Sequence, residues 1–302
     1  MAERRCTNAR GRVAVVIVAA VVVLASTGRA QDDGRTYFTR AGEGQFHIYP
    51  IRPDGSDETR LTHDEVMWHN LPAASPDGRQ LAFQWNTPDF AVSGIAVMSH
   101  TGSGLHMVVD RGQQPAGSPD GLRLAYVCFP DRGQRDLCLV DTDGNGVTIL
   151  TRDEWNDQFI AWAPDSRRIA FSSNRDPAFW LVPPGPNAAL TSDIYTMEVE
   201  SGETVNLTRT LDHEGEPAWS PDGRSVAFSQ GVNGMAALHT LDLETGRERQ
   251  IVGLEMNPRF PAWSPHGSRV LFTSFADVSL YIVDRNGDGL TRLTTNGGLD
   301  HV

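Results

Sequence analysis

The sequence predicts an all-β fold, a six-bladed β-propeller of four-stranded antiparallel blades. Three observations lead to this prediction. One segment recurs at near-constant spacing, each copy holds four strand-like stretches separated by turn residues, and no stretch has helical periodicity. A four-stranded repeat of roughly 40–45 residues is typical of one propeller blade.

The recurring segment is a Ser-Pro-Asp-Gly turn followed by a short apolar strand. Its copies cover 75–83, 118–126, 163–171, 220–228 and 264–272, and their prolines lie 43, 45, 57 and 44 residues apart. Proline presets φ, Asp bonds to the local backbone and Gly supplies the left-handed residue. Ser166 replaces that Gly, so we expect a strained turn, or one of another type, in its copy.

Strand-like stretches complete each unit. A truncated first copy begins with RTYF at 35–38, so that six units fill residues 31–302. The third strands are expected at 47–51, 94–98, 136–140, 193–197, 237–241 and 279–283, with last strands such as 204–208 and 291–295. Aromatic residues at equivalent positions are expected to pack blade against blade: Trp162, Trp219, Trp263, Phe38, Phe83, Tyr126, Phe171, Phe228 and Phe272.

The first unit begins in its second strand and lacks an innermost one. The C-terminal tail contains Leu299, Asp300 and His301, which echo the residues 211–213 that precede an inner strand. We therefore expect the C-terminal tail to supply the missing strand and close the ring, which would remove exposed sheet edges.

Residues 1–30 have the pattern of a secretory signal peptide. Four arginines precede an apolar run from residue 13 to 25, and small residues lead to Ala30. The run is shorter than the ~20 residues of a membrane span. We expect cleavage after Ala30 and a periplasmic or secreted propeller domain over 31–302. The alternative is an uncleaved anchor, which would be the protein's one attachment to a membrane.

Charge argues against nucleic acid as a partner. The chain carries 26 basic and 38 acidic residues. Without residues 1–30, which hold five Arg and one Glu, these become 21 and 37, a formal charge of −16. Such a surface repels phosphate backbones, and no basic cluster offsets it. We expect a monomer with a protein or peptide partner in the cell envelope.

Cys128 and Cys138 flank a turn-rich segment. A hairpin centred on Gly133 would place them opposite each other, close enough for a disulfide in an oxidising compartment. Two half-buried thiols are the alternative.

The five copies, three of which read Ser-Pro-Asp-Gly, resemble the WD-like repeat of the TolB-type propeller family, built around [W/F]SPDG[K/R]-x-[I/L]-[A/V]-[F/Y]. The resemblance covers residues 35–302. It implies a six-bladed propeller outside the cytoplasm that contacts other proteins. TolB carries an additional N-terminal domain for which this sequence has no room, so the resemblance does not extend to its role in envelope integrity.

In a four-stranded meander, the blade-to-blade connections and the loops between second and third strands share one face, called here the funnel face. A convergent polar set is expected there and predicts a binding site. Its members are Asp64, Glu65, His69, Asp157, Gln158, Asp212, His213, Glu214, Glu216, Arg259, Asp300 and His301. The alternative is ordinary solvated loop polarity. His69, His213 and His301 come from different blades and would have to meet to hold a metal.

A long loop between residues 175 and 192 is also expected on the funnel face. It carries Phe179 and Trp180 among prolines, and large apolar groups in a long loop favour a contact site. The alternative is that the loop folds down and caps the rim.

On the opposite face, two turns match the start of a calcium loop. Their candidate ligands are Asp141, Asp143 and Asn145 in one turn, and Asp284, Asn286 and Asp288 in the other. The Glu expected at loop position 12 is missing from both turns, so plain hairpin turns are the alternative.

No catalytic motif is present: the sequence lacks a G-x-S-x-G elbow, H-E-x-x-H and a Walker loop. We therefore predict a binding module without catalytic residues. The alternative is a metal-dependent carbohydrate-active or lyase-like enzyme using the His and acid cluster, because oligogalacturonate lyases have a similar propeller.

Overall fold

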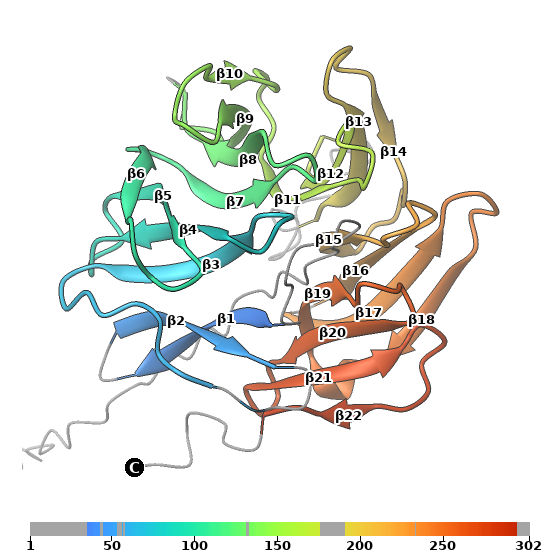
Figure 1. The fold of residues 1–302 in the computed structure, drawn as a ribbon. Helices are drawn as coiled ribbons and strands as arrows, with labels where there is room; N and C mark the ends of the chain where they lie inside the picture. The colour runs from blue at the N-terminus through green and yellow to red at the C-terminus, as the bar shows by residue number, and fades with distance from the viewer. Residues whose placement is uncertain are drawn as a thin grey trace, which may run out of the picture.

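The computed structural model describes residues 35–294, apart from 43–44, 53–55, 57, 131–132, 176–190 and 233. The described residues form five four-stranded sheets and one two-stranded sheet, all antiparallel. Figure 1 shows the sheets arranged around a central axis, with β3, β7, β11, β15 and β19 innermost. The fold is an all-β propeller of four-stranded antiparallel blades, as the repeat predicts.

The strands follow one another outward in each blade. The two-stranded sheet consists of β1 (Thr36–Gly42) and β2 (Gln45–Ile51). The next blade contains β3 (Trp68–Ala74), β4 (Gln80–Asn86), β5 (Ser93–Ser99) and β6 (His106–Val109). It is followed by β7 (Gln113–Gly117), β8 (Arg123–Cys128), β9 (Asp136–Asp141) and β10 (Thr148–Ile149).

The remaining three blades have the same order. One contains β11 (Asp157–Trp162), β12 (Arg168–Ser173), β13 (Asp193–Glu198) and β14 (Thr204–Asn206). The next contains β15 (His213–Trp219), β16 (Ser225–Val232), β17 (Met235–Asp242) and β18 (Glu248–Val252). After the 3-10 turn η2 (Leu254–Met256), the last contains β19 (Pro258–Trp263), β20 (Arg269–Ser274), β21 (Ser279–Asp284) and β22 (Thr291–Arg292). Among the described residues, no helix is long and apolar enough to span a membrane.

The prediction of six four-stranded blades is wrong: the structure has five, and β1 and β2 form only a two-stranded sheet. The segment after β2 does not become a fourth strand. Its described residues make one backbone bond to β2, from Leu61 N to Ile48 O, and Thr62 Oγ1 accepts from Ile48 N, which is too little for a ladder. Closure by the C-terminal tail concerns residues outside the described ranges and stays a prediction.

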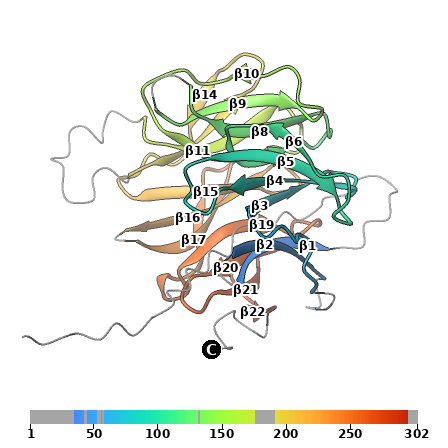
Figure 2. The ribbon, with the colours of Figure 1, turned by 90° about the vertical axis from the view of Figure 1, so that its left-hand side faces the viewer.

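The two-stranded sheet fills the space between the first and last complete blades (Figure 2). Tyr37 and Ile48 belong to a core cluster with Leu81 and Phe83 of the following blade. Phe38 packs on the other side, in a cluster with residues of β19, β20 and β21. Apolar burial on both faces therefore joins segments far apart in the sequence.

A β-bulge interrupts the innermost strand of every complete blade. The register of each shifts near its third or fourth residue. One residue of each bulge has a left-handed backbone: Leu71, Gln114, Phe159, Glu216 and Phe260, with φ of 51°, 53°, 56°, 58° and 53°. A bulge leaves backbone groups without a ladder partner, so these N–H groups need other acceptors.

The preceding sheet supplies acceptors for four of the five bulges. Leu71 N donates to Thr39 Oγ1 (3.2 Å) and Gln114 N to Gln84 Oε1 (3.0 Å). Phe159 N donates to Gln114 Oε1 (2.6 Å). Likewise, Phe260 N donates to Glu216 Oε2 (2.9 Å). These bonds form an inter-blade belt around the axis.

The tryptophans that recur in the repeat pack between blades as predicted. Trp162, Trp219 and Trp263 are all buried. Trp162 Nε1 donates to Ala116 O and Trp263 Nε1 to Ala218 O, each at 3.0 Å and each across to the preceding blade. The predicted aromatic strand centres, from Phe38 to Phe272, are buried as well.

The turn at Ser166 keeps the conformation of the glycine-containing copies. Ser166 has φ 58°, and its N–H donates to Ala163 O like the Gly N–H of the other turns. Its hydroxyl accepts from Asp120 N (3.0 Å) and its carbonyl from Arg123 (3.2 Å), both in the preceding blade. Contacts with the neighbour thus offset the left-handed strain, and a turn of another type is not needed.

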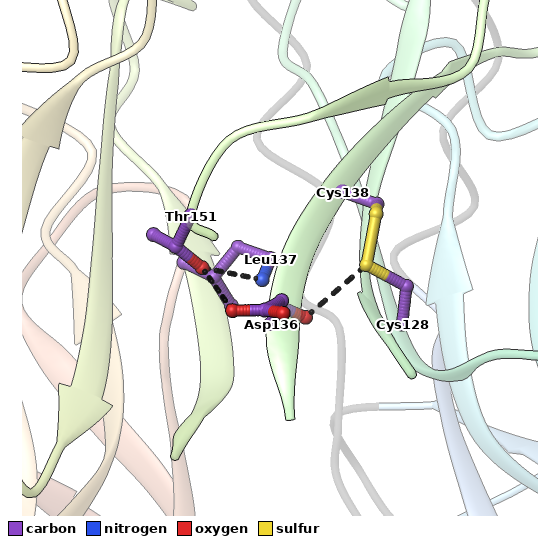
Figure 3. The surroundings of a disulfide bond; sticks show 5 residues. All are labelled: Cys128, Asp136, Leu137, Cys138 and Thr151. Atoms are coloured by element: carbon purple, nitrogen blue, oxygen red, sulfur yellow. Dashed lines mark hydrogen bonds between the residues drawn. A yellow bond between two sulfur atoms is a disulfide. The ribbon is translucent and has the colours of Figure 1, made fainter. Parts of the chain in front are cut away.

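Cys128 and Cys138 are joined by a disulfide, with their Cα atoms 5.9 Å apart (Figure 3). The expectation that the two cysteines lie directly opposite each other is wrong. Cys128 is opposite Asp136, and Cys138 is opposite Tyr126. The bond therefore runs diagonally between β8 and β9. Cys128 Sγ lies 3.5 Å from the carbonyl oxygen of Asp136, at the funnel-face end of β9.

Replacing Gln114 by Ala should lower the free energy of unfolding by about 1–3 kcal/mol, because Phe159 N would lose its acceptor in a partly buried position. Urea unfolding measures the change. Gln80→Ala, at an exposed position of β4, is the matched control. Equal stability of the two variants would show that the belt bond contributes nothing.

Replacing both Cys128 and Cys138 by Ala should lower the free energy of unfolding by about 3 kcal/mol, because the bond closes a short loop in the unfolded chain. The measurement is urea unfolding of the variant beside the oxidised and reduced wild type. A midpoint identical in all three samples would contradict a stabilising role for the bond.

Candidate functional site

The funnel face is built from the starts of the inner strands, the ends of the second strands and the starts of the third strands. In one blade, for example, Asp157 pairs with Ser173, which pairs with Asp193. Most predicted site residues lie at this end: His69, Asp157, His213, Glu214, Glu216 and Arg259. Phe179, Trp180 and His301 lie outside the described residues.

Three phenylalanine rings meet near the axis on this face. Phe159 of β11 and Phe260 of β19 belong to blades that are not neighbours, yet their ring centroids lie 6.3 Å apart with an edge-on geometry. Phe275, in the turn after β20, lies 6.1 Å from Phe260. Phe159 and Phe260 are half-buried and Phe275 is 38% exposed. We call these residues the central aromatic row.

A charged pair lies beside the central aromatic row. Arg259 Nη1 is 3.9 Å from Glu216 Oε1, and Arg259 Nη2 donates to Gly234 O. Glu216 Oε2 accepts from Ser229 Oγ (2.8 Å) as well as from Phe260 N. Burial raises the pKa of Glu216, against the effect of Arg259 and of these hydrogen bonds. Glu216 therefore has two roles, because it joins two blades and places a carboxyl group at the centre.

Glu214 and His213 lie at the start of β15. Ser192 Oγ donates to Glu214 O (2.6 Å) and hydrogen-bonds His213 Nδ1 (2.9 Å). Thr210 Oγ1 donates to the Glu214 carboxyl (2.7 Å). Burial raises the pKa of Glu214 to about 7, because loss of hydration outweighs the hydrogen bonds from Thr208 and Thr210. Glu214 is thus a carboxyl that changes charge near neutral pH.

The structure does not bring the predicted histidines together. His69 is buried, with its ring edge-on to Phe83 at 5.1 Å and near His47 and Asp64. His213 instead contacts Ser192. His213 lies in β15, and the β7 and β11 blades stand between its blade and that of His69. Nothing in the described ranges therefore supports a shared metal between these two histidines.

Asp157 is a buried carboxylate with a basic partner. Arg175 Nη2 donates to both of its oxygens, at 2.8 and 2.7 Å. Burial raises the pKa of Asp157, and Arg175 acts against that rise. Asp136, Asp153 and Asp157 hold carboxylate oxygens within 4.8 Å of one another, as three ligands of a cation would. Arg175 already lies beside two of them, since it is also 3.6 Å from Asp153.

The two calcium-like turns use their polar groups internally. Asn145 donates from its backbone and its side chain to Asp143, both at 3.0 Å. In the second turn, Asn286 Nδ2 donates to Asp288 (2.8 Å). In both turns the Asn side chain thus donates its amide hydrogens to the neighbouring carboxylate. This geometry is that of stable hairpin turns, and calcium binding stays a prediction.

A recurrent Leu-Thr pair is a structural element that the sequence analysis missed. In each pair, the Leu N–H donates to the carbonyl of a residue in the third strand of the unit, and the Thr hydroxyl accepts from the N–H of that same residue. The pairs are Leu61–Thr62, Leu150–Thr151, Leu207–Thr208 and Leu293–Thr294. The recurrence of Leu-Thr at the same place in the repeat was the sequence signal that could have predicted these hydrogen bonds.

Comparison with curated proteins finds partial relatives. The uncharacterized peptidase YuxL of Bacillus subtilis is 32% identical over 117 residues, a match that covers 37% of this chain and 16% of YuxL. An uncharacterized Agrobacterium fabrum protein, Atu1656, is 23% identical over 56% of the chain and 55% of its own length. The Tol-Pal system protein TolB of Alcanivorax borkumensis is 28% identical over 43% of the chain and 28% of its length. This chain thus spans about half or less of each relative, and no family model matches it.

Solved structures show the same architecture. A putative TolB from Agrobacterium tumefaciens has a TM-score of 0.65 at 22% identity, covering 78% of this chain and 83% of that one. TolB from Acinetobacter baumannii has a TM-score of 0.67 at 18% identity, covering 82% and 59%. An oligogalacturonate lyase in complex with manganese has a TM-score of 0.57 at 14% identity, covering 84% and 74%. The chain has a TolB-like β-propeller fold.

The raised pKa of Glu214 makes stability depend on pH. The unfolded chain releases the Glu214 proton near pH 4.5, whereas the folded protein holds it until about pH 7. The contribution of Glu214 to the free energy of unfolding is therefore fully present below pH 4.5 and is lost as the pH rises to about 7. Glu214→Gln should therefore be more stable than the wild type by roughly 3 kcal/mol at pH 8, and little changed at pH 4. Urea unfolding at both pH values measures the difference.

Exposed Glu200, in the turn after β13, offers the control Glu200→Gln. A stability gain at pH 8 that is the same for both variants would show that burial of Glu214 is not its cause.

Proposed function

We propose that this chain is an exported, TolB-like propeller that binds a protein or peptide through its funnel face. The central aromatic row is the observation that carries the proposal. Rings from two blades that are not neighbours converge there beside Glu216 and Arg259, and Phe275 remains partly exposed. Clustered aromatic groups beside an arginine are typical of the energetic centre of a protein interface.

The fold supports the proposal without deciding it. TolB proteins are among the solved structures that share this propeller, and one partial relative is named as part of the Tol-Pal system. By analogy, a partner in the cell envelope fits best. The pattern of residues 1–30 supports export, and the acidic chain favours a partner that is not a nucleic acid.

The metal-dependent lyase alternative gains less support. It required His69 and His213 to share a site, and in the described structure they contact different neighbours. Likeness to the manganese-containing lyase concerns the fold, which hosts unrelated functions. Binding is the function that the geometry supports best.

A photo-crosslinking amino acid placed at Phe275 should capture a specific partner from an envelope extract of the organism that encodes the chain. The same group at Val147, exposed in a turn on the opposite face, is the matched control and should give no equivalent adduct. Mass spectrometry of the adducts is the readout. Identical adducts at both positions, or none at Phe275, would contradict binding through the funnel face.

A further inference from the structure

A second aromatic cluster lies at the rim of the funnel face, away from the central aromatic row. Phe46, Trp68 and Phe90 form it, at the start of β2, the start of β3 and the turn after β4. The Trp68 ring is edge-on to Phe46 at 4.9 Å and to Phe90 at 4.8 Å. Phe46 is buried whereas Phe90 is 50% exposed, so the cluster runs from the core to the surface. We call it the rim aromatic site.

The backbone holds Phe90 in an unfavourable conformation. Its φ is 56°, in the left-handed region that a bulky residue adopts only at a cost of roughly 1 kcal/mol or more. Bonds within the turn impose this geometry, since Phe90 N donates to Thr87 O and Val92 N to Thr87 Oγ1. Glycine would fit the turn better, so the backbone conformation does not account for a phenylalanine at this position.

Apolar side chains extend the rim aromatic site along the chain. Val92, two residues after Phe90 in the same turn, is 43% exposed, and Val66, two residues before Trp68, is 65% exposed. Rings and aliphatic groups left in water mark contact surfaces, and rigid aromatic groups contribute most of the binding energy at such sites.

The same two segments carry only negative charge. Residues 64–68 and 87–92 include Asp64, Glu65 and Asp89 and no basic residue. Burial of Asp64 acts to raise its pKa, but backbone hydrogen bonds from Met67 and Val66 leave that pKa lowered. A hydrogen bond from Thr87 lowers the pKa of Asp89. Both groups therefore stay ionised at neutral pH. Arg40 is paired with Glu58. Arg60 acts on His47 and His69 together with Asp64 and donates to the Thr62 carbonyl, so one basic group lies near three acidic ones.

We infer that the rim aromatic site binds a peptide segment of a protein partner in which an apolar side chain is flanked by lysine or arginine. The apolar group would contact Phe90 and Trp68, and the basic groups would lie near Asp64, Glu65 and Asp89. Cations also interact favourably with exposed aromatic faces. This inference rests on the proposed binding function and specifies the chemistry of the partner.

Three fluorescein-labelled peptides of equal length test the inference: one with a central Leu between Arg and Lys residues, one with the same Leu between Glu residues, and one with a central Ala between Arg and Lys residues. Fluorescence anisotropy should show that the wild type binds the first at least about tenfold more tightly than the others, with affinity falling as salt rises. Equal affinity for all three, or no binding of the first peptide, would overturn the inference.

Phe90→Gly removes the ring while relieving the left-handed backbone, and urea unfolding of the variant checks that the fold is kept. It should weaken binding of the basic Leu peptide about tenfold or more, whereas Val147→Ser on the opposite face should leave it unchanged. Glu65→Gln should weaken binding less and reduce its dependence on salt. If Phe90→Gly binds like Val147→Ser, the rim aromatic site is not the contact.

The Phe275 crosslink separates the two proposals. An adduct at Phe275 together with unchanged peptide affinity in Phe90→Gly would leave the proposed function standing and remove only the rim site. Absence of that adduct would remove the central aromatic row as the contact, and with it the observation that carries the proposed function, even if the basic Leu peptide binds at the rim.

Discussion

The ring depends on hydrogen bonds that cross between blades at the inner-strand bulges. Each bulge places a residue in the left-handed region and takes its N–H out of the ladder, and both changes cost free energy. For four bulges, an oxygen of the preceding sheet accepts that N–H. In an isolated blade these N–H groups would have no protein acceptor. The backbone hydrogen bonds of the inner strand are therefore complete only when the preceding sheet is in place.

The same constraint links the candidate site to the stability of the ring. Glu216 accepts from Phe260 N and also faces Arg259, while Phe159 and Phe260 are bulge residues whose rings meet near the axis. A substitution that alters the chemistry of this centre therefore also alters contacts between blades. In contrast, Phe90 lies in a turn outside the inter-blade belt and is half exposed. A substitution there removes no belt hydrogen bond between blades.

Much of the architecture was predictable because the repeat carries strong local signals. The Pro-Asp-Gly turns fixed the second strands, alternating apolar residues fixed the third, and the recurring Trp and Phe positions are buried between blades. The bulges were not predictable, because no single residue type is common to all five positions and none is glycine: they are Leu71, Gln114, Phe159, Glu216 and Phe260. The number of blades was overestimated, because sequence similarity in the first unit does not show that its last segment can form a ladder.

The site was less predictable than the fold. Burial and pairing separate residues that look alike as sequence: Asp157 is neutralised by Arg175, whereas Glu214, on the equivalent face of the next blade, has no basic partner among its described contacts. His69 and His213 differ in their neighbours for the same reason. Such distinctions depend on contacts between blades, which a linear repeat does not specify.

The two-stranded sheet has a consequence for the order of assembly. Phe38 shares a core cluster with Leu271 and Leu280, so residues near one end of the chain need partners from a blade more than two hundred positions away. Loop closure over that separation is slow and entropically costly. During synthesis, β1 and β2 emerge long before that blade exists. Until that blade has formed, the side chains of Phe38 and Ile51 lack the apolar partners that bury them in the complete ring.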